Sequence, residues 1–219
     1  MSKTLIKNYT KIANEVPKHV TLVAVSKTKP IADIETLYKE GQRIFGENRV
    51  EELVEKNKAL PSDIEWHMIG HLQSKKVKKI APFISLIHSI DSLKLLTEVN
   101  KEAAKNNRII DCLLQFHIAQ EDSKYGFSQE EGLGLLKSLK EQEMNNIRIV
   151  GVMGMATFSD DEDLIKSEFK RLVEISKLTK IILPSATEIS MGMSGDYKLA
   201  IEENSTMVRI GSTIFGSRN

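Results

Sequence analysis

A lysine stands at the end of a short apolar run near the N-terminus. The segment LVAVSKTKP delivers Lys27 directly after a β-branched, strand-like stretch. Because a lysine amine condenses with an aldehyde once desolvation or a nearby positive charge lowers its pKa, Lys27 is a candidate for Schiff-base chemistry. Lys29 is the expected source of that charge. The plainer interpretation is a strand that stops at a polar residue, with Pro30 opening the next helix.

A second group of candidate residues lies near the C-terminus. The segment MVRIGSTIFGSRN places Arg209 inside an apolar strand and follows it with Gly211 and Ser212. Glycine lets backbone N–H groups approach a phosphate closely, and a serine hydroxyl adds a donor. Upstream, SMGMSGD ends another strand with Ser194 and Gly195. The two turns predict a phosphate site; the alternative is a pair of glycine turns with a surface arginine.

The elements that carry these residues alternate along the chain. Short apolar runs are separated by amphipathic stretches with helical periodicity. The predicted strands cover residues 20–25, 43–46, 64–70, 85–90, 109–118, 147–155, 187–193 and 206–211. Eight such units predict an α/β fold, a single (β/α)8 TIM-type barrel over residues 1–219 with an additional N-terminal helix; an open doubly wound sheet is the alternative. In a barrel, Lys27 and the two turns share the mouth at the carboxyl ends of the strands.

The sequence also predicts three helix N-caps and one buried core residue. Asp91, Ser128 and Asp160 each precede an amphipathic stretch and are predicted to cap a helix. The single cysteine, Cys112, lies in the apolar run IIDCLLQF and is predicted to be a buried core residue.

Composition limits the partners. The chain has 219 residues, with 31 basic against 30 acidic side chains and a net charge of +1, so no strong field favours nucleic acid or an acidic membrane. The run SKKVKK is interpreted as a solvated helix face, because no aromatic residue interleaves it. The N-terminal stretch carries no uninterrupted apolar segment, which predicts a cytoplasmic location. His67 and His71 are not expected to bind zinc, because their segment is typical of a strand and turn.

Several motifs together resemble one family. AVSKTKP, FGENRVEE, WHMIGHLQSKKVKKI, HSIDS, DSKYG, SMGMSGD and MVRIGSTIFG are similar to motifs of the pyridoxal phosphate homeostasis proteins, barrels similar to the N-terminal domain of alanine racemase. The resemblance implies that Lys27 holds pyridoxal 5′-phosphate (PLP) as a Schiff base and that Arg209 faces the pyridine nitrogen. It further implies the remaining site residues, with the phosphate bound by Ser194, Gly211 and Ser212 and the ring pocket lined by Asn48 and Ser190.

The same resemblance implies a monomeric, non-catalytic protein of vitamin B6 homeostasis that exchanges PLP with other proteins, including PLP-dependent apoenzymes. An arginine at the ring nitrogen disfavours the protonated ring that most PLP enzymes use. Two alternatives stay open. One is a small PLP-dependent enzyme such as an amino-acid racemase, which needs a general acid opposite Lys27. The other is a lyase that uses the Lys27 Schiff base without a cofactor.

The chain departs from the family pattern in the loops. Lys75, His117 and Ala119 stand where the family commonly has other residues, which makes a role for the Lys124 turn less secure. Lys27 and the predicted phosphate residues are unaffected. His117 with Asp122 and Ser123 does not form a hydrolase site by sequence, because no nucleophile elbow surrounds the serine.

Overall fold

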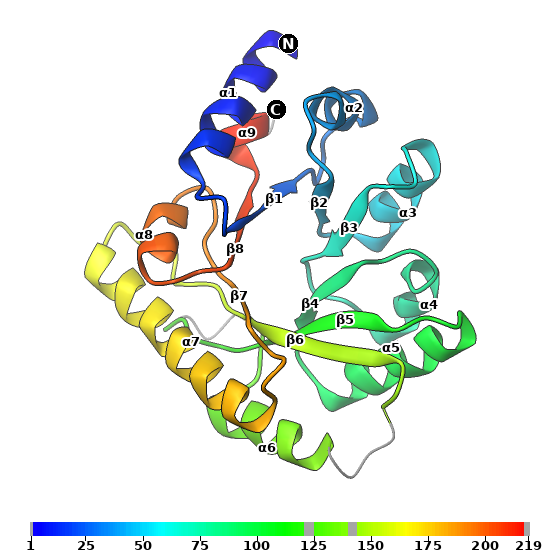
Figure 1. Ribbon diagram of the computed structural model, residues 1–219, viewed down its shortest axis with the longest axis vertical. Coiled ribbons are helices and arrows are strands. Elements are labelled where there is room, and N and C mark those ends of the chain that lie inside the picture. The colour runs from blue at the N-terminus through cyan, green and yellow to red at the C-terminus, as the bar shows by residue number, and fades with distance from the viewer. Residues whose placement is uncertain (1, 121–124, 140–143, 217–219) are drawn as a thin grey trace.

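Eight parallel strands form a closed barrel. The computed structural model describes residues 2–120, 125–139 and 144–216. The strands follow chain order around the barrel, and β8 pairs with β1 to close it (Figure 1). They are β1 (Thr21–Val25), β2 (Ile44–Glu47), β3 (Glu65–Met68), β4 (Leu86–Ile90), β5 (Ile110–Gln115), β6 (Ile147–Met153), β7 (Glu188–Ser190) and β8 (Met207–Ile210). The predicted barrel is confirmed, and the open sheet is excluded.

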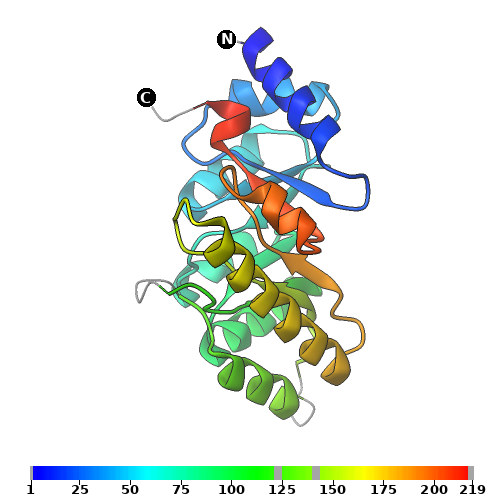
Figure 2. The same cartoon turned by 90° about the vertical axis from the view of Figure 1, so that its left-hand side faces the viewer.

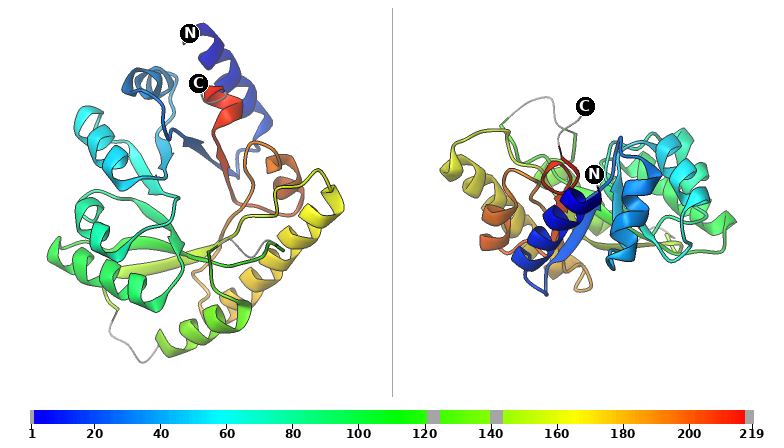
Figure 3. Two further views of the ribbon diagram at one scale, coloured as in Figure 1. Left: turned by 180° about the vertical axis from the view of Figure 1, so that it is seen from behind. Right: turned by 90° about the horizontal axis from the view of Figure 1, so that it is seen from above.

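Helices surround the strands. They are α1 (Ser2–Glu15), α2 (Ile31–Lys39), α3 (Val50–Ala59), the 3-10 turn η1 (Ser74–Lys76), α4 (Val77–Ile80), α5 (Leu93–Lys105), α6 (Gln129–Ser138), α7 (Glu162–Ile182), α8 (Tyr197–Glu202) and α9 (Ser212–Phe215). The long helix α7 runs along the β6–β7 side of the barrel (Figure 3). The predicted N-terminal helix is confirmed as α1, which lies beside α9 near the other end of the chain (Figures 1 and 2).

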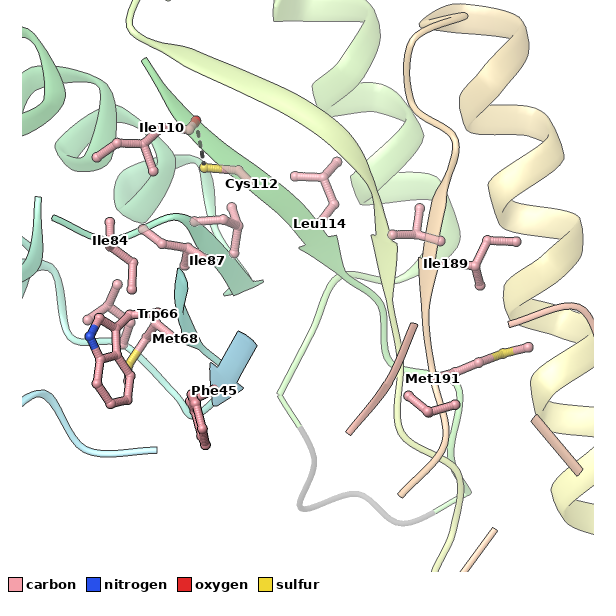
Figure 4. Close-up of a cluster of buried hydrophobic side chains, with 14 of the residues drawn as sticks. Phe45, Trp66, Met68, Ile84, Ile87, Ile110, Cys112, Leu114, Ile189 and Met191 are labelled. Carbon is pink, nitrogen blue, oxygen red and sulfur yellow. Dashed lines mark hydrogen bonds between the residues drawn. The ribbon is translucent and has the colours of Figure 1, made fainter. Parts of the chain in front are cut away.

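Alternating strand residues divide the core into two layers. Side chains that face the helices form a large cluster, part of which is drawn in Figure 4. A smaller cluster draws its buried members from strands alone and fills the lumen: Val23, Leu86, Leu113, Met153 and Met207. Cys112 belongs to the outer layer, is fully buried, and lies 3.7 Å from the carbonyl oxygen of Ile110. Its predicted core role is confirmed, and burial raises the pKa of its thiol.

Two of the three predicted helix caps are wrong by one residue. Ser128 caps α6 as expected and forms a capping box. Helix α5 is capped by Ser92 in place of Asp91, and the Asp91 carboxylate contacts His71 instead. Helix α7 is capped by Asp161 in place of Asp160. Neighbouring Asp and Ser residues are equally good caps, so only the backbone path decides which one is used.

Candidate functional site

Lys27 lies in a tight turn that leaves the carboxyl end of β1. Its side chain is half-buried, and Ser26 before it is fully buried. Thr28 adopts a left-handed backbone with φ of 63°, which is uncommon for a residue other than glycine. Lys27 is the second residue after β1, at the end of the barrel where the loops that follow the strands converge. The lysine therefore stands at the barrel mouth, as predicted.

Lys29 connects the Lys27 turn to the last helix. Its ammonium donates to the carbonyl oxygens of Phe215 and Gly216, each at 3.2 Å. These carbonyls lie at the carboxyl end of α9, where a cation is favoured. Lys29 thus holds the end of the segment that carries the predicted phosphate residues, and its effect on the pKa of Lys27 stays a prediction.

The two predicted phosphate turns lie against each other. The hydroxyl oxygen of Ser194 accepts from the backbone N–H of Gly211 at 3.1 Å and of Thr213 at 3.4 Å. A Cβ on Gly211 would lie 3.3 Å from the carbonyl oxygen of Val25, so this turn also packs closely on β1. Ser212 is exposed at the start of α9. Backbone N–H groups that converge on one oxygen can serve a phosphate oxygen in the same way.

Arg209 is buried in the lumen among neutral acceptors. One guanidinium nitrogen donates to Ser190 Oγ at 2.6 Å and the other to the carbonyl oxygen of Gly154 at 3.1 Å. The residue is 4% exposed, and desolvation lowers its pKa to about 10, against a smaller opposing effect of Asp196. The guanidinium therefore keeps its charge at neutral pH. The partner that a buried strand arginine requires is Ser190.

Two histidines extend this polar layer and were not predicted as part of the site. His88 Nδ1 lies 2.9 Å from Ser190 Oγ, and His88 Nε2 lies 3.0 Å from Nδ1 of His67. Desolvation lowers the pKa of His67 to about 3 and that of His88 well below its ordinary value. Both rings are neutral at pH 7, so Arg209 is the charged member of a hydrogen-bonded chain that runs across the lumen.

Asn48 follows β2 and offers a buried acceptor. Its Oδ1 is buried and has no hydrogen-bond partner within residues 2–120, 125–139 and 144–216. The Asn48 backbone is fixed by close packing, since a Cβ on Gly70 would lie 2.4 Å from the Asn48 carbonyl oxygen. An unpartnered buried acceptor is costly unless a ligand or water supplies a donor.

The other segments singled out by sequence contribute no contact to this arrangement that the described residues show. In the SKKVKK run, Lys76 and Lys79 both pair with Glu51, at 3.0 and 3.5 Å. Lys124, Asp122 and Ser123 lie outside the described residues. Among the residues that are described, no group of three His, Cys, Asp or Glu side chains is arranged to hold a metal ion.

The fold and site together define a barrel of the alanine racemase type, with a lysine after the first strand and backbone amides after the last. The family model of the alanine racemase N-terminal domain matches residues 2–219. The chain is 38% identical over 216 residues to the pyridoxal phosphate homeostasis protein of Synechocystis sp. (strain PCC 6803), covering 96% of this chain and 97% of that protein. The protein of that name from Mus musculus is 40% identical over 211 residues, covering 90% of this chain and 77% of its own length.

Solved structures agree with the sequence relatives. PipY of Synechococcus elongatus PCC7942, with PLP bound, superposes with a TM-score of 0.87 at 31% identity and covers 97% of this chain and 100% of its own. Alanine racemase of Clostridium difficile 630 is 15% identical with a TM-score of 0.77, covering 99% of this chain and 56% of its own, which shows a shared fold. The chain belongs to the pyridoxal phosphate homeostasis proteins, within the alanine racemase N-terminal domain family, and the resemblance read from its motifs is confirmed.

Proposed function

We propose that this protein binds pyridoxal 5′-phosphate as a Schiff base on Lys27 and takes part in vitamin B6 homeostasis by holding and exchanging the cofactor. The observation that carries the proposal is one sector of the barrel mouth. Lys27 follows β1, and Arg209 lies on β8. The Ser194–Gly211 contact joins the turns after β7 and β8. These strands are neighbours, because β8 pairs with both β7 and β1. PipY, a related structure, has PLP bound.

The residues present fit the cofactor. The N–H groups of Gly211 and Thr213, with the hydroxyls of Ser194 and Ser212, suit a phosphate, and Arg209 is a buried donor for a ring nitrogen. The buried Oδ1 of Asn48 suits a polar ring substituent. When bound, PLP supplies an aldehyde for a lysine amine and an aromatic ring that accepts electrons.

The charge of Arg209 favours a carrier over an enzyme. A permanent cation beside the ring nitrogen disfavours protonation of that nitrogen, which weakens the ring as an electron acceptor. Transfer to PLP-dependent apoenzymes, a monomeric state, a single domain over residues 1–219, a cytoplasmic location and the absence of a nucleic-acid partner all stay predictions. Within the described part of the chain, every helix is too short or too polar to cross a bilayer.

A small PLP-dependent racemase is the second candidate, because a stacked pair of rings with acid–base groups follows two other strands of the barrel. His71 and Tyr125 stack with their centroids 4.2 Å apart, and His71 Nδ1 lies 3.0 Å from the Asp91 carboxylate. They follow β3 and β5, which lie two and four strands from β1 in the barrel order, and a racemase needs a proton donor opposite Lys27. Formation of D-alanine from L-alanine by the PLP-loaded protein, lost in Tyr125→Phe, would favour this candidate.

An absorption experiment tests the proposed function. Purified wild type, Lys27→Ala and the exposed-lysine control Lys39→Ala are mixed with PLP and scanned in the near-ultraviolet and visible before and after borohydride. We expect wild type and Lys39→Ala to develop a yellow band that borohydride fixes to the protein, and Lys27→Ala to lack it. A band that survives in Lys27→Ala contradicts the Schiff base on Lys27. The absence of a band in wild type would favour the cofactor-free lyase.

A further inference from the structure

A buried charged cluster lies directly behind the Lys27 turn. The ammonium of Lys56, on α3, donates to Glu47 Oε1 at 2.7 Å, to Glu52 Oε1 at 2.6 Å and to the carbonyl oxygen of Ser26 at 2.7 Å. The Lys56 and Glu47 side chains are 5% and 0% exposed. We call these four residues, Ser26, Glu47, Glu52 and Lys56, the Lys56 cluster.

The Lys56 cluster holds the backbone on both sides of Lys27. Before the lysine, the Ser26 hydroxyl donates to Glu47 Oε1 at 2.6 Å, and the Ser26 carbonyl accepts from Lys56. After the lysine, the Thr28 N–H donates to Glu52 Oε1 at 2.5 Å. One ammonium therefore joins both flanks of Lys27 through two carboxylates, and the second contact fixes the left-handed conformation of Thr28.

Stability alone does not account for this cluster. Removing an ion pair from water costs free energy that its attraction often fails to recover, and apolar residues of similar volume frequently serve as well. The second carboxylate oxygen of Glu47 is buried with no partner in the described part of the chain, and burial raises the pKa of this group. What the charges supply beyond an apolar contact is direction, because two of the hydrogen bonds hold the backbone groups that flank Lys27, namely the Ser26 carbonyl and the Thr28 N–H.

We propose that the Lys56 cluster is a positioning device, which sets the direction of the Lys27 amine toward an aldehyde whose phosphate is held by the Gly211 and Ser194 turns. This inference rests on the proposed function. In the reaction the lysine nitrogen bonds to the aldehyde carbon, a C=N bond replaces C=O, and the oxygen leaves as water with the two amine protons. No oxidant or reductant is needed. Misplacement of a reacting group by about 1 Å can slow a reaction on the order of a hundredfold.

The test separates positioning from folding by its choice of variants. Lys56→Met alone would leave Glu47 buried without its ammonium, so the main variant is Glu47→Gln/Lys56→Met, which removes both charges and keeps the volume. The matched control, Glu55→Gln/Lys58→Met, makes the same changes at exposed positions of the same helix. Glu52→Ala is a milder variant that removes the acceptor of the Thr28 N–H together with the weaker-buried carboxylate partner of Lys56, and it keeps the buried Lys56–Glu47 pair.

Two ligands are compared on each variant. PLP reports the rate of Schiff-base formation in stopped flow, and pyridoxine 5′-phosphate, which has the ring and phosphate without an aldehyde, reports binding at equilibrium. We expect the main variant to keep a wild-type unfolding midpoint and an affinity for pyridoxine 5′-phosphate within about twofold, while Schiff-base formation slows about tenfold or more. Glu52→Ala should slow it less and should speed amide exchange at Thr28, and the control should match wild type.

Each remaining outcome overturns the inference. A folded main variant, or a folded Glu52→Ala, that forms the Schiff base at the wild-type rate removes the positioning role and leaves the proposed function standing. An equal loss of rate and of pyridoxine 5′-phosphate affinity means a general collapse of the mouth. If wild type forms no borohydride-fixable adduct on Lys27, the proposed function and the inference both fail.

Discussion

The two ends of the candidate site are built with different chemistry. At the lysine end, the turn after β1 is fixed by ion pairs: the Lys56 ammonium contacts both Glu47 and Glu52. At the phosphate end, the donors are backbone N–H groups, and their present partner is the hydroxyl of Ser194 at 3.1 and 3.4 Å. The hydrogen bonds at the lysine end are short and involve charged groups, whereas those at the phosphate end are longer and join neutral groups.

This difference suits the two tasks of a protein that holds and exchanges a ligand. A group that forms a covalent bond must keep one direction, and paired charges in a buried place supply that rigidity. A group that admits and releases an anion must exchange one weak partner for another, and a neutral hydroxyl that accepts from backbone N–H groups costs little to displace. Three sets of substitutions test whether the two ends differ in this way.

The largest expected effect is on stability at the lysine end. Lys56→Met removes the ammonium from Glu47, and breaking one partner of a buried pair typically costs roughly 3–5 kcal/mol of unfolding free energy. Glu47→Gln/Lys56→Met should recover most of that loss, because the fully buried position 47 then carries no charge, and Glu52, whose side chain is 20% exposed, keeps the hydrogen bond from the Thr28 N–H. Chemical denaturation at pH 7 measures both. Equal destabilisation of the single and double variants would show that the charges themselves are not what the fold depends on.

A smaller effect is expected when acid reaches the neutral histidines of the lumen. His67 has a pKa of about 3 in the fold and ordinarily 6.5, so the unfolded chain binds the extra proton between these values. Its stabilisation is therefore complete above about pH 6.5 and is lost as the pH falls toward 3. Between pH 7 and pH 5 the loss should be on the order of 2 kcal/mol from this residue.

Substitution isolates that pH dependence. His67→Gln/His88→Gln should flatten the decline in unfolding free energy between pH 7 and pH 5, while the exposed-histidine control His19→Gln should leave it unchanged. Glu47 acts with the opposite sign: its raised pKa favours the fold below about pH 4.5, and this contribution is lost as the pH rises. A decline that persists in the double histidine variant would place its source elsewhere.

The smallest expected stability change is at the phosphate end. Ser194→Ala removes a neutral acceptor from the N–H groups of Gly211 and Thr213, which should cost about 0.5–1.5 kcal/mol. Its effect on ligand affinity should be plainer, with pyridoxine 5′-phosphate binding about tenfold more weakly in calorimetry. Unchanged affinity would exclude Ser194 from the phosphate site.

Sequence patterns predicted the parts of the site that lie at strand ends and turns, but not the parts that form when distant elements pack together. The positions of Lys27 and the Gly211 turn could be predicted because each comes just after an apolar strand. An arginine within such a strand also predicts a hydrogen-bond partner for its guanidinium. The Lys56 cluster could not be predicted in this way, because Lys56 lies in an ordinary amphipathic helix and is buried only once α3 packs beside β2 and β3. The contact of His67 with His88 likewise depends on how β3 and β4 pair.

Mapping the modified lysine tests the Schiff base most directly. Wild type is equilibrated with PLP, reduced with borohydride, digested and analysed by peptide mass spectrometry, with Lys27→Ala beside it. We expect the reduced cofactor on the peptide that contains Lys27, at close to full occupancy, and little retention in Lys27→Ala. Cofactor spread over exposed lysines such as those of the SKKVKK run, with equal amounts in both proteins, would contradict a dedicated site at the end of β1.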